Sequence, residues 1–582
     1  MRFRTKETAE AMDGAHAALR LDDPQRRSAG IARVLGAGAP RCPHFRVEPH
    51  VVQDAHLLPW LQRQPQSCVG RAWLTHLLHH PCTDAGVLHA RAAARLPPPA
   101  AAALHDLHAL EADALWALTL PDLKTTWPMP FLFPTWPLLR TLNRLPLLLE
   151  AFHAYRLWFA PAMQVLYPVL LLLGPYLFLR RKLGWKLSLG DYLKLALMLF
   201  KTAIQSGGRH AAGPLLSLAF YVGLYLYGVV QMIDMARMVH AFRRTLRQRL
   251  RNLRRFYEGV RAASDAFWHD LEYDLDAAPF GFGDLAPLPP WCASGTIQDI
   301  YAVWTNARLQ ENLAQALRWL AVLDILAAKE RLLRQLGHTP VDWTAASSRG
   351  ASSLGPPVRL WGMAHPALEA SVRNPACLAR HLVVTGPNAA GKTTYLRGIL
   401  ANVLLAQTLG VARASRAQMA PHVGIATFMR LGDETGRASL FEAEVERCLA
   451  MWRAVEAGPK GPFLLVLDEP MHATPPVEGA AAAMAFLKLV GGVPGVRVLA
   501  TTHYHALTEL ARDAAVAFAN VSMEARLAAD GGIAFPYRLR AGPSFQCIAL
   551  ELLRERHFPA AFVEDAIEIK NKLSRQSVTR AE

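Results

Sequence analysis

One glycine-rich segment contains the residue types that a phosphate-binding loop needs. Residues 386–393 read GPNAAGKT and match the pattern GxxxxGK[ST]. The two glycines allow backbone N–H groups to surround a phosphate, Lys392 would reach its outer oxygens, and Thr393 would present a hydroxyl to Mg²⁺. The residues expected to bind the nucleotide are Gly386, Pro387, Asn388, Ala389, Ala390, Gly391, Lys392, Thr393 and Thr394.

The flanking residues predict the elements that position this loop. HLVVT at 381–385 is typical of a short buried strand, and the helix-forming sequence YLRGILANVLLAQTL follows the loop at 395–409. A loop between a strand and a helix N-terminus places the helix dipole at the phosphates. We therefore expect ATP, with Mg²⁺, as the cofactor of this segment.

Two further apolar segments end in residues suited to hydrolysis. FLLVLDEP at 463–470 predicts a strand whose end presents Asp468 to Mg²⁺ and Glu469 to the attacking water. VRVLATTH at 496–503 predicts a third strand ending on His503, either as a sensor of the γ-phosphate or as a structural cap. The expected reaction is ATP hydrolysis.

Composition sets wider limits on the chain. At 582 residues it is long enough for several domains, and a net charge of +16 favours phosphate-rich or anionic-lipid surfaces without choosing between them. The seven cysteines are scattered and never spaced as CxxC, so neither a disulfide framework nor a zinc site is indicated. The charged N-terminus has no apolar core of a signal peptide, and we expect no cleavable secretory signal.

Two long uncharged runs lie in the middle of the chain. Residues 157–179 and 213–233 are each long enough to cross a bilayer as a helix. Pro161, Pro168 and Pro175 recur on one face of the first run and predict a kink. Aromatic residues suited to a membrane interface flank the runs, namely Trp158, Tyr176 and Trp185. Transmembrane insertion is the favoured interpretation, and a buried helical hairpin in a soluble core is the alternative.

Charged residues around the runs indicate their orientation. Residues 243–255, RRTLRQRLRNLRR, hold seven arginines, which favours the cytoplasmic side of a membrane. The same stretch is a candidate for binding DNA phosphates, and a juxtamembrane flank is the alternative. Residues 183–204 read as an amphipathic interfacial or re-entrant helix, or as an ordinary amphipathic helix of a soluble domain. The connector between the runs also carries cations, so the charge rule is not clean; they are Arg180, Arg181, Lys182, Lys186, Lys194 and Lys201. The need for ATP, which is cytoplasmic, indicates the orientation better. Two spans return the chain to one side, so we expect a multi-pass membrane protein with its ATPase domain facing the cytoplasm.

The C-terminal motifs resemble those of the MutS family of mismatch-repair ATPases. TGPNAAGKTTYLR at 385–397 looks like the family's TGPN-x-x-GK-[ST] loop, and ATTHYHAL at 500–507 is similar to its ATHY-x-EL. RLGDETGRASLFEAEVERC at 430–448 resembles the segment before the second strand. The shared residues there are Gly436, Arg437, Ser439, Phe441 and Glu444. An ABC transporter subunit would instead carry more spans and an LSGGQ-like segment.

The resemblance implies partners and a further catalytic residue. It implies a homodimer with composite ATP sites, in which Ser439 caps the γ-phosphate of the partner subunit; a helix N-cap is the alternative role for this serine. It also implies DNA binding and mismatch repair. However, only residues 1–50 precede the part that resembles the MutS core, and they contain no Phe-x-Glu wedge, so direct mismatch reading is not expected. The stretch DEPMHATPPVEG at 468–479 also departs from the family pattern.

These features predict an α/β P-loop ATPase domain of the ABC type, preceded by a mostly α-helical region with two candidate transmembrane helices. The expected segments are a partly disordered arm at 1–50, a helical MutS-core-like segment at 51–150, a membrane region at 151–240, a helical segment returning to the ATPase at 241–344, and the MutS-like ATPase domain with C-terminal dimerisation helices at 345–582. The alternatives to a DNA-linked ATPase are an ATP-driven membrane scaffold and a divergent ABC-type transporter subunit.

Overall fold

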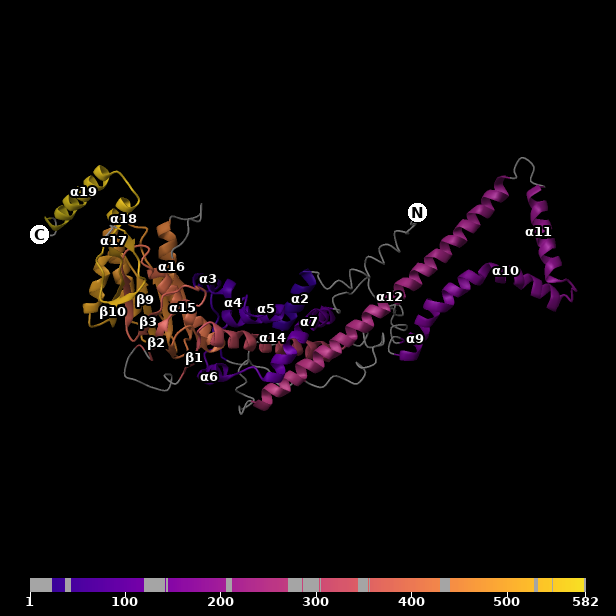
Figure 1. The fold of residues 1–582 in the computed structure, drawn as a ribbon, viewed down its shortest axis with the longest axis horizontal. Helices are drawn as coiled ribbons and strands as arrows, with labels where there is room; N and C mark the ends of the chain where they lie inside the picture. The colour runs from indigo at the N-terminus through magenta and orange to yellow at the C-terminus, as the bar shows by residue number, and fades with distance from the viewer. Residues whose placement is uncertain are drawn as a thin grey trace. The chain divides into compact units, whose positions relative to one another are not determined.

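The computed structural model groups the chain into two compact units (Figure 1). The residues it describes are 24–36, 43–119, 142, 145–205, 212–270, 285, 303, 305–343, 354, 356–429, 440–527, 532–546 and 548–579. The sheet unit comprises 31–108, 260–285 and 315–582, and the helical unit comprises 1–30, 109–259 and 286–314. Each unit is described by itself below.

The sheet unit is built on a six-stranded sheet with the order β13-β10-β4-β9-β8-β7. Its strands are β4 (His381–Thr385), β7 (Gly424–Phe428), β8 (Phe463–Asp468), β9 (Val496–Thr501), β10 (Phe518–Met523) and β13 (Leu539–Ala541). Five of them pair in parallel, and β13 runs antiparallel to β10 at the edge. The parallel register places Asp468 beside Thr501, so the polar ends of β8 and β9 meet at one edge of the sheet.

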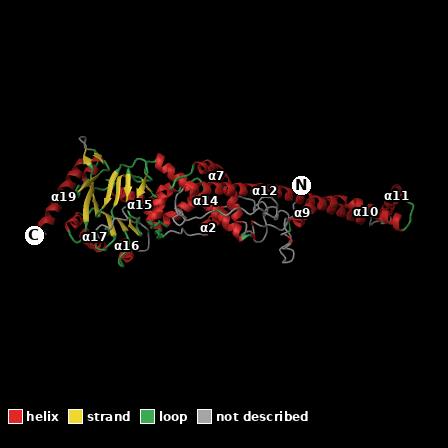
Figure 2. Ribbon diagram, turned by 90° about the horizontal axis from the view of Figure 1, so that it is seen from below, coloured by secondary structure: helices red, strands yellow, loops and turns green. Residues whose placement is uncertain are grey.

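Helices cover both faces of this sheet, which explains why its strands are continuous apolar runs. Every residue of β4 and of β9 is buried. Helices α16 (Leu440–Val455) and α17 (Pro476–Gly491) contribute to a core with β7, β8 and β9. Helix α15 (Lys392–Leu409) lies against β8 and β9 (Figure 2). The predicted strand, loop and helix around residue 386 are confirmed.

A second sheet and several helices complete the sheet unit. The sheet has the order β3-β2-β6-β1-β5, with β1 (Thr339–Asp342), β2 (Val358–Met363), β3 (Asn374–Leu378), β5 (Val411–Ala412) and β6 (Arg416–Gln418). A short hairpin joins β11 (Arg526–Leu527) to β12 (Ile533–Ala534). The C-terminal elements are η8 (His505–Arg512), α18 (Ala549–Glu555) and α19 (Ala560–Thr579).

The region before the ATPase motifs is helical, as predicted. Its helices are α2 (Pro24–Gly36), α3 (Pro49–Asp54), α4 (Leu58–Leu61), α5 (Cys68–His79), α6 (Ala85–Ala93), α7 (Pro98–Thr119) and, later in the chain, α14 (Ala307–Gln335). Helices α5 and α6 contact α15, the helix that follows the glycine-rich loop. The helical segment is therefore packed directly against the element that begins at Lys392.

Two buried cations tie these helices together within the sheet unit. Arg91 in α6 donates to the carbonyl oxygens of Gln407 and Thr408, in the last turn of α15, at 3.2 and 3.3 Å. Lys329 in α14 donates to the carbonyls of Arg91, Ala92 and Ala94 at the end of α6. Cations at helix C-termini satisfy carbonyl groups that have no partner inside the helix. Burial lowers the pKa of Lys329 to about 7.

The helical unit contains the two apolar runs. Its elements are α9 (Pro146–Ala154), the π-helical turn η3 (Tyr155–Phe159), α10 (Ala160–Lys182), α11 (Leu189–Gln205) and α12 (Ala212–Asp270). Two stretches, Leu147–Lys182 and Ala219–His269, are long and apolar enough to cross a membrane, and only 6% and 0% of their apolar windows are buried. A core helix of a soluble domain would be mostly buried. Length, composition and exposure therefore give weak support for membrane association.

Two side-chain contacts join α9 and α10 to α12. Arg243 of α12 forms an ion pair with Glu150 of α9 at 2.5 Å, and the Tyr225 hydroxyl donates to the Val165 carbonyl at 3.1 Å. The two contacts occur in opposite order along the two segments, so the segments run antiparallel where they touch.

Candidate nucleotide-binding site

The loop between β4 and α15 has a backbone that only glycine tolerates at one position. Gly386 has φ 135°, and a Cβ atom built there would lie 1.9 Å from the carbonyl oxygen of Met523. Gly391 has φ 96° and precedes the first residue of α15. Left-handed φ values and close backbone approach are the two conditions that exclude side chains. The glycines therefore fix the loop's path around the start of the helix.

Lys392 is folded back into this loop. Its ammonium group donates to the carbonyl oxygens of Gly386 and Pro387 at 2.8 and 3.2 Å, and it lies 3.6 Å from a carboxylate oxygen of Glu469. Burial lowers the pKa of Lys392, and the carboxylates of Glu469 and Asp468 oppose that shift. A cation held this way sits where it can exchange these oxygen partners for phosphate oxygens.

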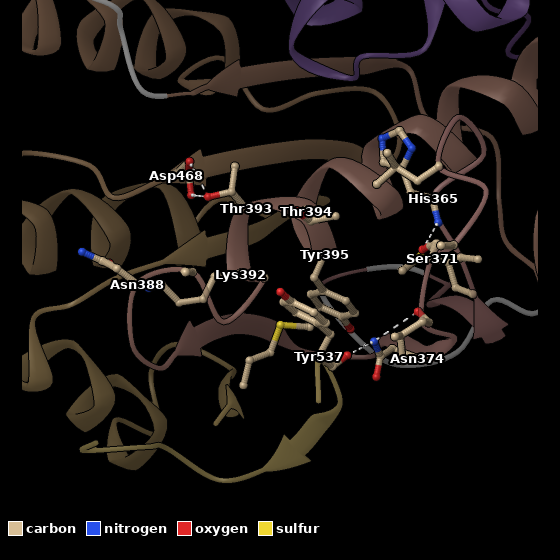
Figure 3. A pocket seen from close by; sticks show the side chains of 18 of the residues that line it. His365, Ser371, Asn374, Asn388, Lys392, Thr393, Thr394, Tyr395, Asp468 and Tyr537 are labelled. Atoms are coloured by element: carbon tan, nitrogen blue, oxygen red, sulfur yellow. Dashed lines mark hydrogen bonds between the residues drawn. The ribbon is translucent and has the colours of Figure 1, made fainter. Parts of the chain in front are cut away.

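A hydroxyl and a carboxylate meet across the sheet edge. Thr393 Oγ1 donates to Asp468, lying 3.0 Å from both carboxylate oxygens (Figure 3). The hydroxyl of Thr501 on β9 donates to Asp468 Oδ1 at 2.6 Å and accepts from the Glu469 backbone N–H at 3.0 Å. Hard oxygen ligands of this kind suit Mg²⁺, which binds proteins through one or two such groups and keeps its remaining sites for water and phosphate. The donor set at Thr393 and Asp468 fits that ion.

Glu469 and His503 lie beside this pair. Glu469 has a left-handed backbone with φ 51°, and its Oε2 lies 4.0 Å from Nδ1 of His503, which is 44% exposed. The structure thus brings Lys392, Thr393, Asp468, Glu469 and His503 together at the ends of neighbouring strands. Ser439 lies outside the described residues.

A cavity of about 630 Å³ extends from the loop to a second wall. That wall was not predicted from sequence; it includes His365, Ser371, Asn374 and Tyr537 (Figure 3). The Asn374 amide donates to the Tyr537 carbonyl and accepts from the Leu539 N–H, both at 2.8 Å. Only the part of the cavity lined by the glycine-rich loop carries a spaced sequence motif, because an apolar wall is defined by its shape rather than by a fixed residue pattern.

The segment after Glu469 is fixed by a buried acid. Glu444 of α16, which is 4% exposed, accepts from the Ala473 backbone N–H at 3.3 Å and contacts His472 Nδ1 at 3.1 Å. The Tyr504 hydroxyl donates to the Met471 carbonyl at 3.0 Å. These contacts join α16, which follows the segment containing Ser439, to the acidic end of β8.

The arginine run 243–255 lies inside α12 and has two faces. Arg249 points inward, 3.8 Å from a carboxylate oxygen of Asp113 and 4.5 Å from the ring centre of Trp116. The exposed arginines of the run are Arg244, Arg247, Arg251, Arg254 and Arg255. Part of the run therefore stabilises the helical unit, and the rest forms a cationic surface.

A strand, a glycine-rich loop, a helix and two polar-ended neighbouring strands define a P-loop nucleotide-binding domain of the α/β class. Residues 382–574 match the family model for MutS domain V, which is the P-loop ATPase domain of MutS proteins. These matches support assignment of the C-terminal third of the chain to the MutS family.

Relatives agree with this assignment over the same third of the chain. The DNA mismatch repair protein MutS of Geobacillus sp. (strain WCH70) is 29% identical over 201 residues, and that of Streptococcus pyogenes serotype M1 is 26% identical over 197 residues. Each match covers 34% of this chain and 22% of the relative. The chain therefore spans about a fifth of the length of these relatives.

Proposed function

We propose that the sheet unit binds and hydrolyses ATP with Mg²⁺. The observation that carries this proposal is the contact between Thr393 and Asp468 beside the buried Lys392, at the open end of a cavity large enough for a nucleotide. Lys392 binds the β- and γ-phosphates, and Thr393 and Asp468 hold Mg²⁺. Glu469 polarises the attacking water, and His503 contacts the γ-phosphate. The ion supplies charge neutralisation at the transferred phosphate.

The opposite wall of the cavity binds the base in this proposal. Tyr537 offers a ring for stacking, and Asn374 holds the backbone that follows it, at the Tyr537 carbonyl and the Leu539 N–H. His365 is held neutral, because burial lowers its pKa to about 4. A neutral imidazole at this wall adds contact surface without repelling or attracting the phosphates.

The active form in this proposal is a homodimer with composite sites. Ser439 of one subunit caps the γ-phosphate in the other, and Glu444 connects that segment to the residues after Glu469. ATP binding and hydrolysis would then change the subunit interface. The contacts of Glu444 would link the segment that contains Ser439 to the residues after Glu469 in the same subunit.

We infer that the helical unit anchors the protein in a membrane. Almost none of the residues in the two apolar windows are buried, and two contacts join the helices that contain them. Contact of this apolar surface with water is unfavourable, whereas contact with lipid acyl chains is favourable. The ATPase unit and the arginine run then face the cytoplasm. A protein that stayed in the soluble fraction, monodisperse and without detergent at physiological salt, would contradict this anchoring.

Two physiological roles fit an anchored ATPase of this type. The names of the relatives favour DNA as the partner, with the exposed arginines of 243–255 contacting phosphates without reading sequence. The exposed apolar windows favour an ATP-driven membrane scaffold, in which the same arginines would contact lipid headgroups instead of DNA. The experiment measures ATP turnover of the full chain in detergent with and without duplex DNA at about 150 mM salt, where nonspecific contacts are already weakened. Stimulation together with a shifted labelled duplex supports the DNA role, and turnover that ignores DNA supports the scaffold.

A further inference from the structure

The corner between α10 and α11 is a built structure. Tyr176, the buried residue of α10, donates its hydroxyl to the Leu187 carbonyl at 3.2 Å and accepts from Arg180 at 3.2 Å. Its ring lies 5.4 Å from that of Tyr192 in α11. Gly184 turns the backbone with φ 68°. These contacts fix where the end of α10 and the start of α11 present their side chains.

Cations gather on this corner without acidic partners. Arg180, Arg181, Lys182 and Lys186 are exposed, and within the described residues none of them forms an ion pair. The nearby acid, Asp191, is engaged in capping α11: its carboxylate accepts from the Ser188 hydroxyl at 2.6 Å. The corner therefore keeps its positive charge.

Helix α11 adds two more cations and an apolar face. Lys194 and Lys201 are seven residues apart and share one side of the helix, together with Asp191. The opposite side carries exposed leucines, including Leu195 at 42% and Leu199 at 64%, whereas Leu197 lies between the two lysines. At 17 residues with three charges, α11 is too short and too polar to span a bilayer. A helix of this kind lies in the plane of a membrane interface, with its apolar face in the acyl region.

The cations and the apolar surface are adjacent, which selects the ligand. Phe178 and Trp185 are 58% and 49% exposed and flank the charged positions 180–182. A free phosphate or the backbone of a duplex would neutralise the charges but leave these rings in water. An anionic phospholipid covers both, because its phosphate meets the cations and its acyl chains cover the rings.

We propose that this corner binds the headgroups of anionic phospholipids in the leaflet opposite the ATPase unit. The proposal rests on the membrane anchoring proposed above, and it names the lipid that the anchor selects. The polar edge of α11 continues the headgroup contact through Lys194 and Lys201. The hairpin tip is then held at the far surface by charge as well as by burial.

The test uses full-length protein in neutral detergent and two fluorescent lipids with identical acyl chains, phosphatidylglycerol and phosphatidylcholine. Binding is measured by energy transfer from tryptophan. We expect the wild type to prefer the anionic lipid at least about tenfold at about 0.05 M salt, and to lose most of this preference at about 0.5 M salt. Inorganic phosphate at about 10 mM should not displace the lipid, since it lacks the acyl chains.

The variant Arg180→Gln/Arg181→Gln/Lys182→Gln/Lys186→Gln should reduce the preference for the anionic lipid at least about threefold, and the remaining cations, including Lys194 and Lys201, account for what is left. A matched control removes four exposed cations elsewhere, at Arg308, Arg453, Lys460 and Arg554, and should keep the preference. The conservative variant Arg180→Lys/Arg181→Lys should also keep it, which separates loss of charge from loss of fold.

Three results would overturn the proposal. They are equal binding of both lipids by the wild type, an unchanged preference in the four-glutamine variant, and loss of the preference in the matched control. Equal binding leaves the membrane anchor standing and removes only the headgroup site. A wild type that binds neither lipid and remains soluble without detergent removes the anchor as well.

Discussion

The polar side chains at the sheet edge stabilise one another across three elements. Asp468 accepts from Thr393 on α15 and from Thr501 on β9, while Lys392 approaches Glu469. Each group would otherwise be a partly buried charge or hydroxyl without a partner, which costs free energy. The same contacts hold the side chains near the positions that a nucleotide and Mg²⁺ would require.

Lys392→Ala and Glu469→Gln should separate ATP binding from hydrolysis. The alanine variant removes the cation that neutralises phosphate charge, so we expect loss of tight ATP binding. The glutamine variant keeps the shape but cannot polarise water, so it should bind ATP and turn over at least about a hundredfold more slowly. Binding of a fluorescent ATP analogue and phosphate release measure the two steps. Equal turnover by wild type and Glu469→Gln would refute the role of this carboxylate.

Gly386→Ala should damage the loop far more than an alanine at another left-handed glycine. The added Cβ would meet the Met523 carbonyl at 1.9 Å, so the backbone must move. Gly458 has φ 71° with open space around it, and Gly458→Ala should cost only about 1 to 2 kcal/mol of conformational strain. We expect nucleotide binding to fall at least about tenfold in the first variant and to be retained in the second. Similar binding by both would show that the close approach to Met523 is unimportant.

At the scale of elements, the cation in α14 makes the stability of the sheet unit depend on pH. Lys329 titrates near 7 in the folded protein and near 10.5 in the unfolded chain. Between these values the unfolded state binds more protons, so the free energy of unfolding rises with pH, by at most about 1.4 kcal/mol per unit. Below pH 7 both states are protonated and this dependence disappears.

The stability of wild type relative to Lys329→Met should therefore increase from pH 7 to pH 9.5. Thermal unfolding followed by circular dichroism, at several pH values, measures the difference. The control Lys460→Met changes an exposed lysine, and its stability should change with pH in the same way as that of the wild type. If the stability of Lys329→Met also changed with pH in the same way as that of the wild type, the buried ammonium group would not be the source of the pH dependence.

The sequence predicted those elements that have a local signature. Three of these elements are the strands β4, β8 and β9, which the sequence shows as short apolar runs. The runs are apolar because helices cover both faces of the sheet. The second sheet was not predicted, since its strands are short and pair across long sequence separations. Tyr537 was missed as part of the cavity for a similar reason: only folding brings it beside Asn374.

At the scale of the whole molecule, mixing two inactive variants tests the proposed dimer with composite ATP sites. Ser439→Ala and Lys392→Ala should each be inactive alone if the serine acts across the interface. Mixing them should restore some ATPase activity, because a heterodimer contains one intact composite site and one doubly damaged site. Turnover of the mixture, with subunit exchange verified by labelled protein, is the measurement.

The alternative role of Ser439 gives a different result. A serine that only caps α16 contributes about 1 kcal/mol of stability, so Ser439→Ala would keep near-normal turnover and melt at a lower temperature. An inactive single variant with no recovery on mixing, in preparations that exchange subunits, would exclude action across the interface.

The contacts of α9 and α10 with α12 have a consequence for how the helices adapt to membranes of different thickness. The runs 157–179 and 213–233 would be about 34 and 31 Å long as helices, slightly more than the hydrocarbon core of about 30 Å. Because Arg243 with Glu150 and Tyr225 with Val165 join the two arms, neither arm can adjust its depth alone. Hydrophobic mismatch must then be relieved by a common tilt of the whole hairpin, which increases as the acyl chains of the surrounding lipid become shorter.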